Sequence, residues 1–354
     1  MKKILSFAFA LAAVSFAVSC NKETAATVET ETVTFSIELP GAIQSKAIAD
    51  GEKATTLYYA TYTKEGKQLL SLSNTTDGVA ISGKTATVTL QLVKDIPYHV
   101  VFWAQDKAQD KDRQAFTFDW GKATMTVSYD GAANDDLRDA FYAVVNNVVM
   151  ANGASLPTGD LDGNGEVEEF SSVNLKRPFA QINFGTAQND YDSVTEYYDV
   201  TSVDAGMKSA FVCSAQLPNV LNLLDRSVSG DASANFTATV IPGDPKGLKV
   251  GGKDYRYVSM NYVLAPAGDT PEMIDEVTAT FTYRHDPTAT SDDINRPITV
   301  VNVPILRNYR TNIIGDFFTV DTPFTVIVVS EFDDDANNDG EIDDPDHIIT
   351  VPQQ

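Results

Sequence analysis

The stretch that decides the fold reads VTFSIEL and runs from Val33 to Leu39. Its apolar residues are Val33, Phe35, Ile37 and Leu39, and one polar residue lies between each pair. A period of two is typical of a β-strand with one buried face. Pro40 and Gly41 follow, and this pair ends strands. The sequence therefore predicts a first strand over residues 33–39, and much of the chain repeats its pattern.

Further runs of β-branched and aromatic residues fill the chain, with Gly and polar turns between them. In the first half they are Leu57–Thr63, Val79–Ile81, Thr85–Val93, Tyr98–Ala104, Phe116–Phe118 and Met125–Val127. In the second half they are Val173–Gly185, Ser209–Ala215, Phe236–Ile241, Tyr257–Leu264, Glu276–Arg284, Ile298–Val303 and Phe324–Val329. Such runs favour the strands of antiparallel sandwiches, so the predicted fold class is mainly β.

Two segments carry helical signals instead. The apolar residues of Asn134–Met150 recur at helical spacing after a capping run of Asn and Asp. These residues are Leu137, Phe141, Val144 or Val145, and Val148. Pro218–Leu224 begins with Pro and favours a short helical turn. The sequence thus predicts a β protein with one or two short helices.

Residues 1–19 have the features of an export signal. Lysines precede an apolar segment from Ile4 to Val18, which is shorter than a membrane-spanning helix requires. The small residues before Cys20 resemble the lipobox that directs acylation of a cysteine and cleavage in front of it. We expect a lipidated Cys20, followed by a flexible tether over residues 20–32.

Composition narrows the function. The chain has 354 residues and a formal net charge of −23, from 49 acidic and 26 basic side chains. This length allows two domains, each with its own core. An acidic surface repels nucleic-acid phosphates, so nucleic acid is not an expected partner. If Cys20 is lipidated, Cys213 is the remaining thiol and no intramolecular disulfide forms.

A domain boundary is predicted at about Ser172. Residues 152–172 are acidic and rich in turn formers, and strand patterns resume after them. The predicted N-terminal domain spans residues 33–172, and the predicted C-terminal domain spans residues 173–330. An acidic tail follows over residues 331–354.

The segment behind the first strand, residues 42–54, is small, polar and turn-forming. Exposed loops of this composition are where proteases cut. A trypsin-like protease would therefore cleave between Lys46 and Ala47. An ordinary uncut loop fits the same composition equally well.

Two acidic loops have the spacing of calcium ligands. In the tail, oxygen-bearing side chains alternate along a twelve-residue loop with Gly at the sharp turn. The candidate ligands are Asp335, Asn337, Asp339, Glu341, Asp343 and Asp346. Asp346 stands where such loops usually have Glu, which favours weak binding at millimolar calcium. A solvated acidic tail is the alternative.

The second loop begins in the same way but has Ser171 at its last position. Its candidate ligands are Asp160, Asp162, Asn164 and Glu168. Calcium is the one cofactor that the sequence suggests, and none is required. The sequence has no phosphate loop, paired-histidine zinc motif or nucleophile elbow. His99 lies in an apolar strand, where a hydrogen-bonded sheet histidine is the expected role, so no enzyme is predicted.

Several segments together resemble the fimbrillin family of type V pilus subunits and fimbrillin-like surface lipoproteins of anaerobic bacteria. They are the lipobox at Cys20, residues 44–50, Asp139–Tyr142, Leu175–Phe184 and Leu306–Gly315. The resemblance implies two transthyretin-like β-sandwich domains and a precursor anchored by lipid to the outer membrane at the cell surface. It also implies that cleavage after Lys46 removes the first strand and that a strand of the next subunit replaces it. The best-known members carry Arg at the cleavage position.

Two functions from different classes follow. The first is a structural pilus subunit that polymerises with other subunits by strand exchange. Phe324–Val329 is its preferred donor strand, Ile348–Val351 is a shorter rival, and the last strand of its own domain is the alternative role for Phe324–Val329. The second function is a monomeric surface lipoprotein that keeps its first strand and binds a glycan or a host protein through its loops.

Overall fold

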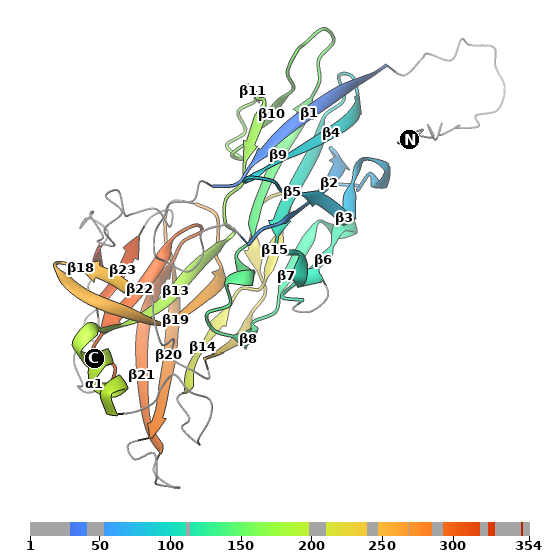
Figure 1. The fold of residues 1–354 in the computed structure, drawn as a ribbon. Helices are drawn as coiled ribbons and strands as arrows, with labels where there is room; N and C mark the ends of the chain where they lie inside the picture. The colour runs from blue at the N-terminus through green and yellow to red at the C-terminus, as the bar shows by residue number, and fades with distance from the viewer. Residues whose placement is uncertain are drawn as a thin grey trace, which may run out of the picture.

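The structure, a computed structural model, describes residues 29–40, 53–110, 114–197, 210–238, 247–268, 270–284, 293–318, 325–329 and 348–349. Strands dominate these residues and form an elongated molecule with two lobes (Figure 1). The mainly β fold predicted from the sequence is therefore confirmed. Single turns of 3-10 helix lie at Leu70–Leu72, Lys107–Asp110, Trp120–Lys122 and Asp136–Arg138.

The first lobe is a sandwich of two sheets. The smaller sheet has the order β12–β1–β4, with β12 at Ser172–Asn174, β1 at Thr30–Glu38 and β4 at Thr85–Val93. The larger sheet has the order β11–β10–β9–β5–β2–β3. Its bounds are Glu168–Glu169 for β11, Thr158–Asp160 for β10, Phe141–Val149 for β9, Tyr98–Gln105 for β5, Thr56–Thr63 for β2 and Asn74–Ala80 for β3. Buried side chains of both sheets form one core between them.

A third layer covers the opposite face of the larger sheet. It has the order β16–β15–β7–β6, with β16 at Val228–Ser229, β15 at Val220–Asn222, β7 at Thr124–Val127 and β6 at Phe116–Asp119. As a result, β5 is buried on both faces. Phe102 packs in the core between the two sheets of the sandwich, and Trp103 packs in a second core between the larger sheet and the third layer. The two buried faces explain why Val100–Ala104 of β5 are apolar at consecutive positions instead of alternating with polar residues.

The second lobe is also built from two sheets. One has the order β18–β19–β13–β22–β23–β24, and the other has the order β21–β20–β14–β17–β8. The first has bounds Gly247–Val250 for β18, Lys253–Leu264 for β19, Phe179–Ala187 for β13, Arg310–Gly315 for β22, Thr325–Val329 for β23 and Ile348–Ile349 for β24. The second has bounds Asp293–Ile305 for β21, Glu272–Arg284 for β20, Ala210–Leu217 for β14, Ala232–Ala238 for β17 and Asp130–Ala132 for β8. Phe281 packs between them, with ring centroids 5.5 Å from Phe317 and 5.0 Å from Phe318.

Strands from the two halves of the sequence pair with one another. β8 pairs in parallel with β17, and β7 pairs antiparallel with β15. One buried cluster accordingly contains residues of both halves. The boundary predicted at about Ser172 falls at β12, which pairs with β1, whereas β13 belongs to the second lobe.

The helix predicted over Asn134–Met150 is wrong. The segment instead forms the turn Asp136–Arg138 and strand β9, which pairs with β5. Phe141, Val145 and Val148 all lie in the first core, and their spacing resembles that of a helix. The reason is a bulge: Asn147 has a φ of +53°, and the register with β5 shifts there. One extra residue in the strand therefore turned a period of two into a spacing of three.

The helical turn predicted over Pro218–Leu224 is also wrong, because its centre is strand β15, which pairs with β7 and β16. The α-helix of the described chain lies elsewhere, at Gln188–Tyr197 (α1). Asp190 on its first turn accepts hydrogen bonds from the Thr186 hydroxyl at 2.5 Å and from the Phe318 amide at 2.8 Å. These partners are distant in sequence or outside the helix, so no local sequence pattern predicted this helix.

Candidate functional site

The predicted first strand, β1, is the centre of the candidate site. It pairs antiparallel with β4 along its whole length and in parallel with β12 at Ser36–Glu38. At one end the Leu39 amide donates to the Lys84 carbonyl at 2.9 Å, and the Leu175 amide donates to the Glu38 carbonyl at 2.9 Å. Both edges of β1 are therefore occupied near its C-terminal end.

The buried face of β1 fills the first core. Val33, Phe35 and Ile37 are at most 2% exposed, as their alternation predicted. The ring of Phe35 lies 5.6 Å from that of Phe102 and 5.8 Å from that of Phe170. Burying one such side chain stabilises a fold by about 1.5–3 kcal/mol. The strand is thus a large part of its own sandwich, and its loss would uncover aromatic rings.

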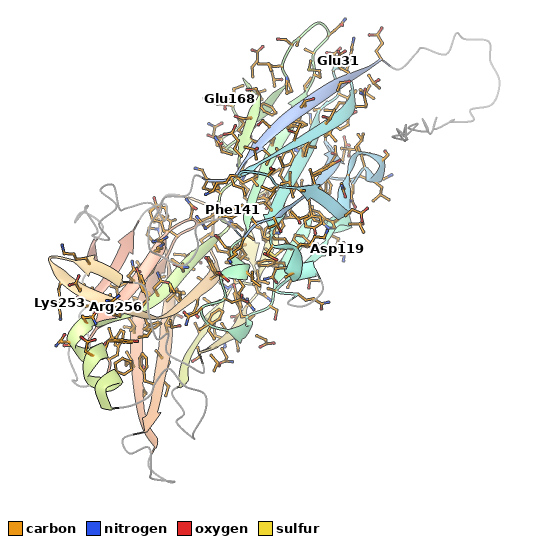
Figure 2. The ribbon with its side chains drawn as sticks, in the orientation of Figure 1. Glu31, Asp119, Phe141, Glu168, Lys253 and Arg256 are labelled. Atoms are coloured by element: carbon orange, nitrogen blue, oxygen red, sulfur yellow. The ribbon has the colours of Figure 1, made fainter. Side chains whose placement is uncertain are left out.

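The outer face of β1 is polar but uncharged in its middle. Gln91 Nε2 on β4 donates to Thr32 Oγ1 at 2.6 Å, and Thr34 Oγ1 lies 3.3 Å from Thr89 Oγ1. Charges appear at the outer end of the strand, where Glu31 lies (Figure 2). There Lys94 Nζ lies 3.3 Å from a carboxylate oxygen of Glu29 and 3.4 Å from one of Glu31. Hydrogen bonds from Lys94 to these carboxylates raise its pKa above the ordinary value.

Several predicted site residues lie outside the described residues. They are Cys20, Lys46, Ala47 and the tail residues Asp335, Asn337, Asp339, Glu341, Asp343 and Asp346. Lipidation, cleavage and calcium binding in the tail therefore stay predictions. In the part of the chain that the structure describes, no helix is both long and apolar enough to cross a membrane.

The two candidate donor strands are neighbours in one sheet. β23 covers most of Phe324–Val329 and pairs with β22, and Val326 is 0% exposed. β24 contains Ile348 and Ile349 and pairs with β23. Within the described residues β23 therefore serves as an interior strand of its own domain, the alternative that the sequence left open. Removing it would break its own sheet, whereas β24 lies at the sheet's end.

The acidic loop at Asp160 is held by its own backbone. Asp160 is 5% exposed, and its carboxylate accepts from the Gly163 amide at 2.7 Å and from the Gly165 amide at 3.2 Å. Asp162 accepts from the Asn164 amide at 3.0 Å, while Glu168 lies on β11 and is exposed. Among described residues, no three His, Cys, Asp or Glu side chains are grouped to hold a metal. Calcium binding here stays a prediction.

His99 has the structural role that the sequence predicted. Its Nδ1 lies 2.7 Å from Asn146 Oδ1 on β9, and its Nε2 lies 3.3 Å from the Lys64 carbonyl. The other two histidines, His285 and His347, lie outside the described residues.

Three of the segments that carried the family resemblance lie among the described residues, Asp139–Tyr142, Leu175–Phe184 and Leu306–Gly315, and they contact one another. Arg177, in the link between β12 and β13, pairs with Asp139 at 2.6 Å and lies 4.6 Å from the ring centroid of Phe141. Figure 2 shows Phe141 where the two lobes meet. Gln181 on β13 is opposite Arg310 on β22, which joins the segment Leu175–Phe184 to the segment Leu306–Gly315. No local pattern indicated the ion pair, since its two residues are far apart in the chain.

Comparison with solved structures gives three fimbrial proteins among the similar chains. The tip fimbrial protein Mfa3 from Porphyromonas gingivalis, with C-terminal truncation, is 11% identical, with a TM-score of 0.41 over 85% of this chain and 99% of that chain. The fimbrial anchor protein Mfa2 from Porphyromonas gingivalis is 12% identical, with a TM-score of 0.37 over 84% and 96%. A fimbrial assembly protein from Parabacteroides distasonis is 11% identical, with a TM-score of 0.38 over 86% and 98%. All three are described as fimbrial proteins.

Among curated proteins, no sequence matches this chain. Residues 24–352 match a family described as a family of unknown function, DUF6562. That match spans both lobes, the candidate site and most of the acidic tail. The chain therefore belongs to the family DUF6562.

Proposed function

We propose that this protein is a structural subunit of a surface pilus, made as a fimbrillin-like lipoprotein precursor and assembled by protease-triggered strand exchange. In this proposal, acylation of Cys20 anchors the precursor to the outer membrane. Cleavage between Lys46 and Ala47 then separates β1 from the rest of the chain. The vacated groove accepts a strand from another subunit, so the partners are other copies or other pilus subunits.

The position of β1 is the observation that carries the proposal. Its removal would free the edges of both β4 and β12 and expose Phe102 and Phe170. Unpaired backbone groups and an open apolar groove are both unfavourable in water. An incoming strand regains the ladder hydrogen bonds and the buried area together, which gives assembly its driving force.

The end of the chain is the better donor. We assign this role to Ile348–Val351, because β23 is an interior strand whose withdrawal would damage its own sheet. The donor would present Ile349 and Val351 on one face, since side chains two apart in a strand point the same way. The shorter segment is thus favoured over Phe324–Val329.

Limited proteolysis of the purified chain tests this function. After treatment with a trypsin-like protease, we expect a product that begins at Ala47 and a ladder of oligomers on a denaturing gel run without boiling. Lys46→Ala should prevent both, whereas Lys53→Ala, which removes another lysine of the same stretch, should leave both intact. A clean cut after Lys46 that gives no oligomers at any protein concentration would refute strand exchange.

A second candidate function is that of a monomeric surface lipoprotein which keeps β1 and binds a glycan. One pocket favours it, an open hollow of about 720 Å³ between β14, β17 and β20. Its polar lining includes Ser214, Gln216, Asn235, Glu272 and Glu276. Hydroxyl, amide and carboxylate groups of this kind suit sugar hydroxyls. Binding to a glycan array by the uncleaved chain, lost in Glu272→Ala, would support this function.

A further inference from the structure

We propose that the outer edge of β4 joins two copies of this chain through an antiparallel β4–β4 contact. β4 lies at the end of the sheet β12–β1–β4, beside β1 (Figure 1). The contact would extend the sheet across two molecules. It requires neither cleavage nor strand exchange, so it stands independently of the proposed function.

The hydrogen bonds at both ends of β4 establish which residues face outward. The Leu39 amide donates to the Lys84 carbonyl at 2.9 Å, and the Lys94 amide donates to the Glu29 carbonyl at 3.1 Å. Even-numbered residues of β4 therefore turn their backbone groups toward β1, and the alternate residues turn theirs away. The residues that face outward are Thr85, Thr87, Thr89, Gln91 and Val93.

Two of these five residues already have partners for their outward groups. Thr85 exchanges backbone hydrogen bonds with Ser82 at 2.9 and 3.1 Å, and the Val93 amide donates to the Tyr98 hydroxyl at 3.3 Å. Within the described residues, the outward amides and carbonyls of Thr87, Thr89 and Gln91 accept or donate no such bond. These three residues are exposed. The open edge is thus a defined unit of three residues.

Among the described residues, β21 is the longest edge strand and is protected against pairing, whereas β4 is not. β21 ends its sheet and contains Pro297 and Pro304, and Asn302 interrupts it with a φ of +54°. Proline, bulges and charges are how proteins keep edge strands apart. β4 reads TATVTLQLV, without Pro, Gly or a charged residue. An edge strand without these protecting features is suited to pair with another strand.

A second copy fits this edge because the pairing is self-complementary. A two-fold axis at Thr89 sets Thr89 opposite Thr89 and Thr87 opposite Gln91, so all three open residues of each copy are used. A register shifted by two residues would use Thr85 or Val93, whose outward groups are already bonded. The same register sets Val88 opposite Leu90, so the buried faces of the two sheets remain continuous.

Charge favours this edge over the rest of the surface as the contact between two copies. The chain carries a net charge of −23, and two such molecules repel each other over most of their surfaces. The middle of β4 is uncharged, so this repulsion is smallest there. The proposed register brings Lys84 of one copy to the end where Lys94 of the other lies with Glu29 and Glu31. One positive charge then meets a group of one positive and two negative charges.

Sedimentation equilibrium of the purified, uncleaved chain tests the association. We expect a mass that rises from one chain to two with increasing concentration. Thr89→Lys places two ammonium groups opposite each other, and like charges directly across a pair of strands destabilise it, so the association constant should fall at least about tenfold. Thr34→Lys is the matched control, because Thr34 is next to Thr89 on the same face but belongs to β1. Its association constant should stay within about twofold of the unchanged protein.

A disulfide tests the register. Directly opposite residues of a hydrogen-bonded antiparallel pair have Cα atoms about 5.5 Å apart, within disulfide range. Thr89→Cys should therefore form a covalent dimer under mild oxidation, and mass spectrometry should find a disulfide between the introduced cysteines of the two copies. Thr34→Cys should not, because three strand spacings separate the two copies of residue 34, about 14 Å in total.

Three results would overturn the proposal. They are a single-chain mass at every concentration, a dimer that Thr89→Lys leaves unchanged, and equal crosslinking of Thr34→Cys and Thr89→Cys. The first two exclude the β4 contact itself, and the third excludes the proposed register.

Discussion

Arg177 donates two hydrogen bonds to Asp139, from Nε to Oδ1 at 2.6 Å and from Nη2 to Oδ2 at 2.9 Å. The side chains are 4% and 1% exposed, so the pair is buried on all sides. It ties the segment before β9 to the link between β12 and β13, where the two lobes join. The preceding residue, Lys176, adds two backbone hydrogen bonds to Tyr142 at 2.8 and 3.1 Å.

Asp139→Ala should strongly destabilise the protein. It leaves the Arg177 guanidinium buried without its carboxylate, which typically costs about 3–5 kcal/mol. Urea unfolding measures the loss. The control is Lys122→Ala, which removes an exposed ion pair with Asp119 and should change the free energy of unfolding little. The double variant Asp139→Leu with Arg177→Met should recover most of the stability, and equal losses in all three variants would contradict this role.

Phe35→Ala should weaken the packing of β1 in the sandwich and destabilise the protein. Truncating a buried Phe costs about 3–5 kcal/mol, because the cavity beside Phe102 and Phe170 is not refilled. Chemical unfolding of the uncleaved chain measures this loss, and the release of β1 after cleavage should be faster. Thr34→Ala changes the exposed side of the same strand and should alter stability by no more than about 0.5 kcal/mol. Similar values for the two variants would show that β1 contributes little.

Ile349→Asp should separate the two donor candidates. If Ile348–Val351 is the donor, a buried carboxylate at Ile349 should suppress the oligomer ladder and leave the melting temperature of the uncleaved chain nearly unchanged. Val326→Asp should instead lower the melting temperature, since Val326 is fully buried within its own sheet. A normal ladder from Ile349→Asp would exclude this segment as the donor.

Calcium should bind the tail weakly. Extracellular calcium loops have dissociation constants of about 10⁻⁴–10⁻³ M, and the ligand set with Asp346 in the last position falls in that class. Isothermal titration of the full chain with calcium should show a heat of binding, and Asp339→Ala should remove that heat. Asp162→Ala alters the other acidic loop and should leave the heat of the tail unchanged. The absence of heat at millimolar calcium would exclude the site.

Tyrosine ionisation should destabilise the protein in alkali. Burial raises the pKa of Tyr257 from 10 to about 12, so the folded state keeps the phenol protonated where the unfolded state does not. The stabilisation from Tyr257 is therefore complete below pH 10 and is lost as the pH rises toward 12. Unfolding measured between pH 9 and about 12 should show this decline. In Tyr257→Phe the slope should be smaller, although the hydrogen bond to Asn312 at 3.0 Å is also lost.

Much of the fold was predictable because the alternation of apolar and polar residues in a half-buried strand, with a period of two, is simple to detect. The strand of Val33–Leu39 alternates since one of its faces is buried and the other is exposed, and the structure confirms it as β1. β4 follows the same rule in all of its first eight residues. Where both faces are buried the rule fails, and where a bulge changes the spacing, as at Asn147, the pattern imitates a helix.

The candidate site was predictable in part. Alternation predicted the strand β1, which the structure confirms, and composition predicted a loop around Lys46, which lies outside the described residues. Neither indicated that β1 lies between β4 and β12, since β12 is more than 130 residues away in sequence. The buried pair of Asp139 and Arg177 had no local signal either, because charged residues in a sequence usually mark an exposed surface.

By itself, the sequence determined most of the strands and the acidic charge, because a strand's period depends on residues close together in the chain and charge depends on composition alone. The tertiary structure decided which strands lie in the interior of a sheet and which lie at an edge. That choice places β1 and β23 inside their sheets and, within the part of the chain that the structure describes, leaves the outward groups of Thr87, Thr89 and Gln91 open. The physical reason is that a backbone hydrogen bond between strands depends on pairing across the chain, and a local pattern of side chains does not record the partner.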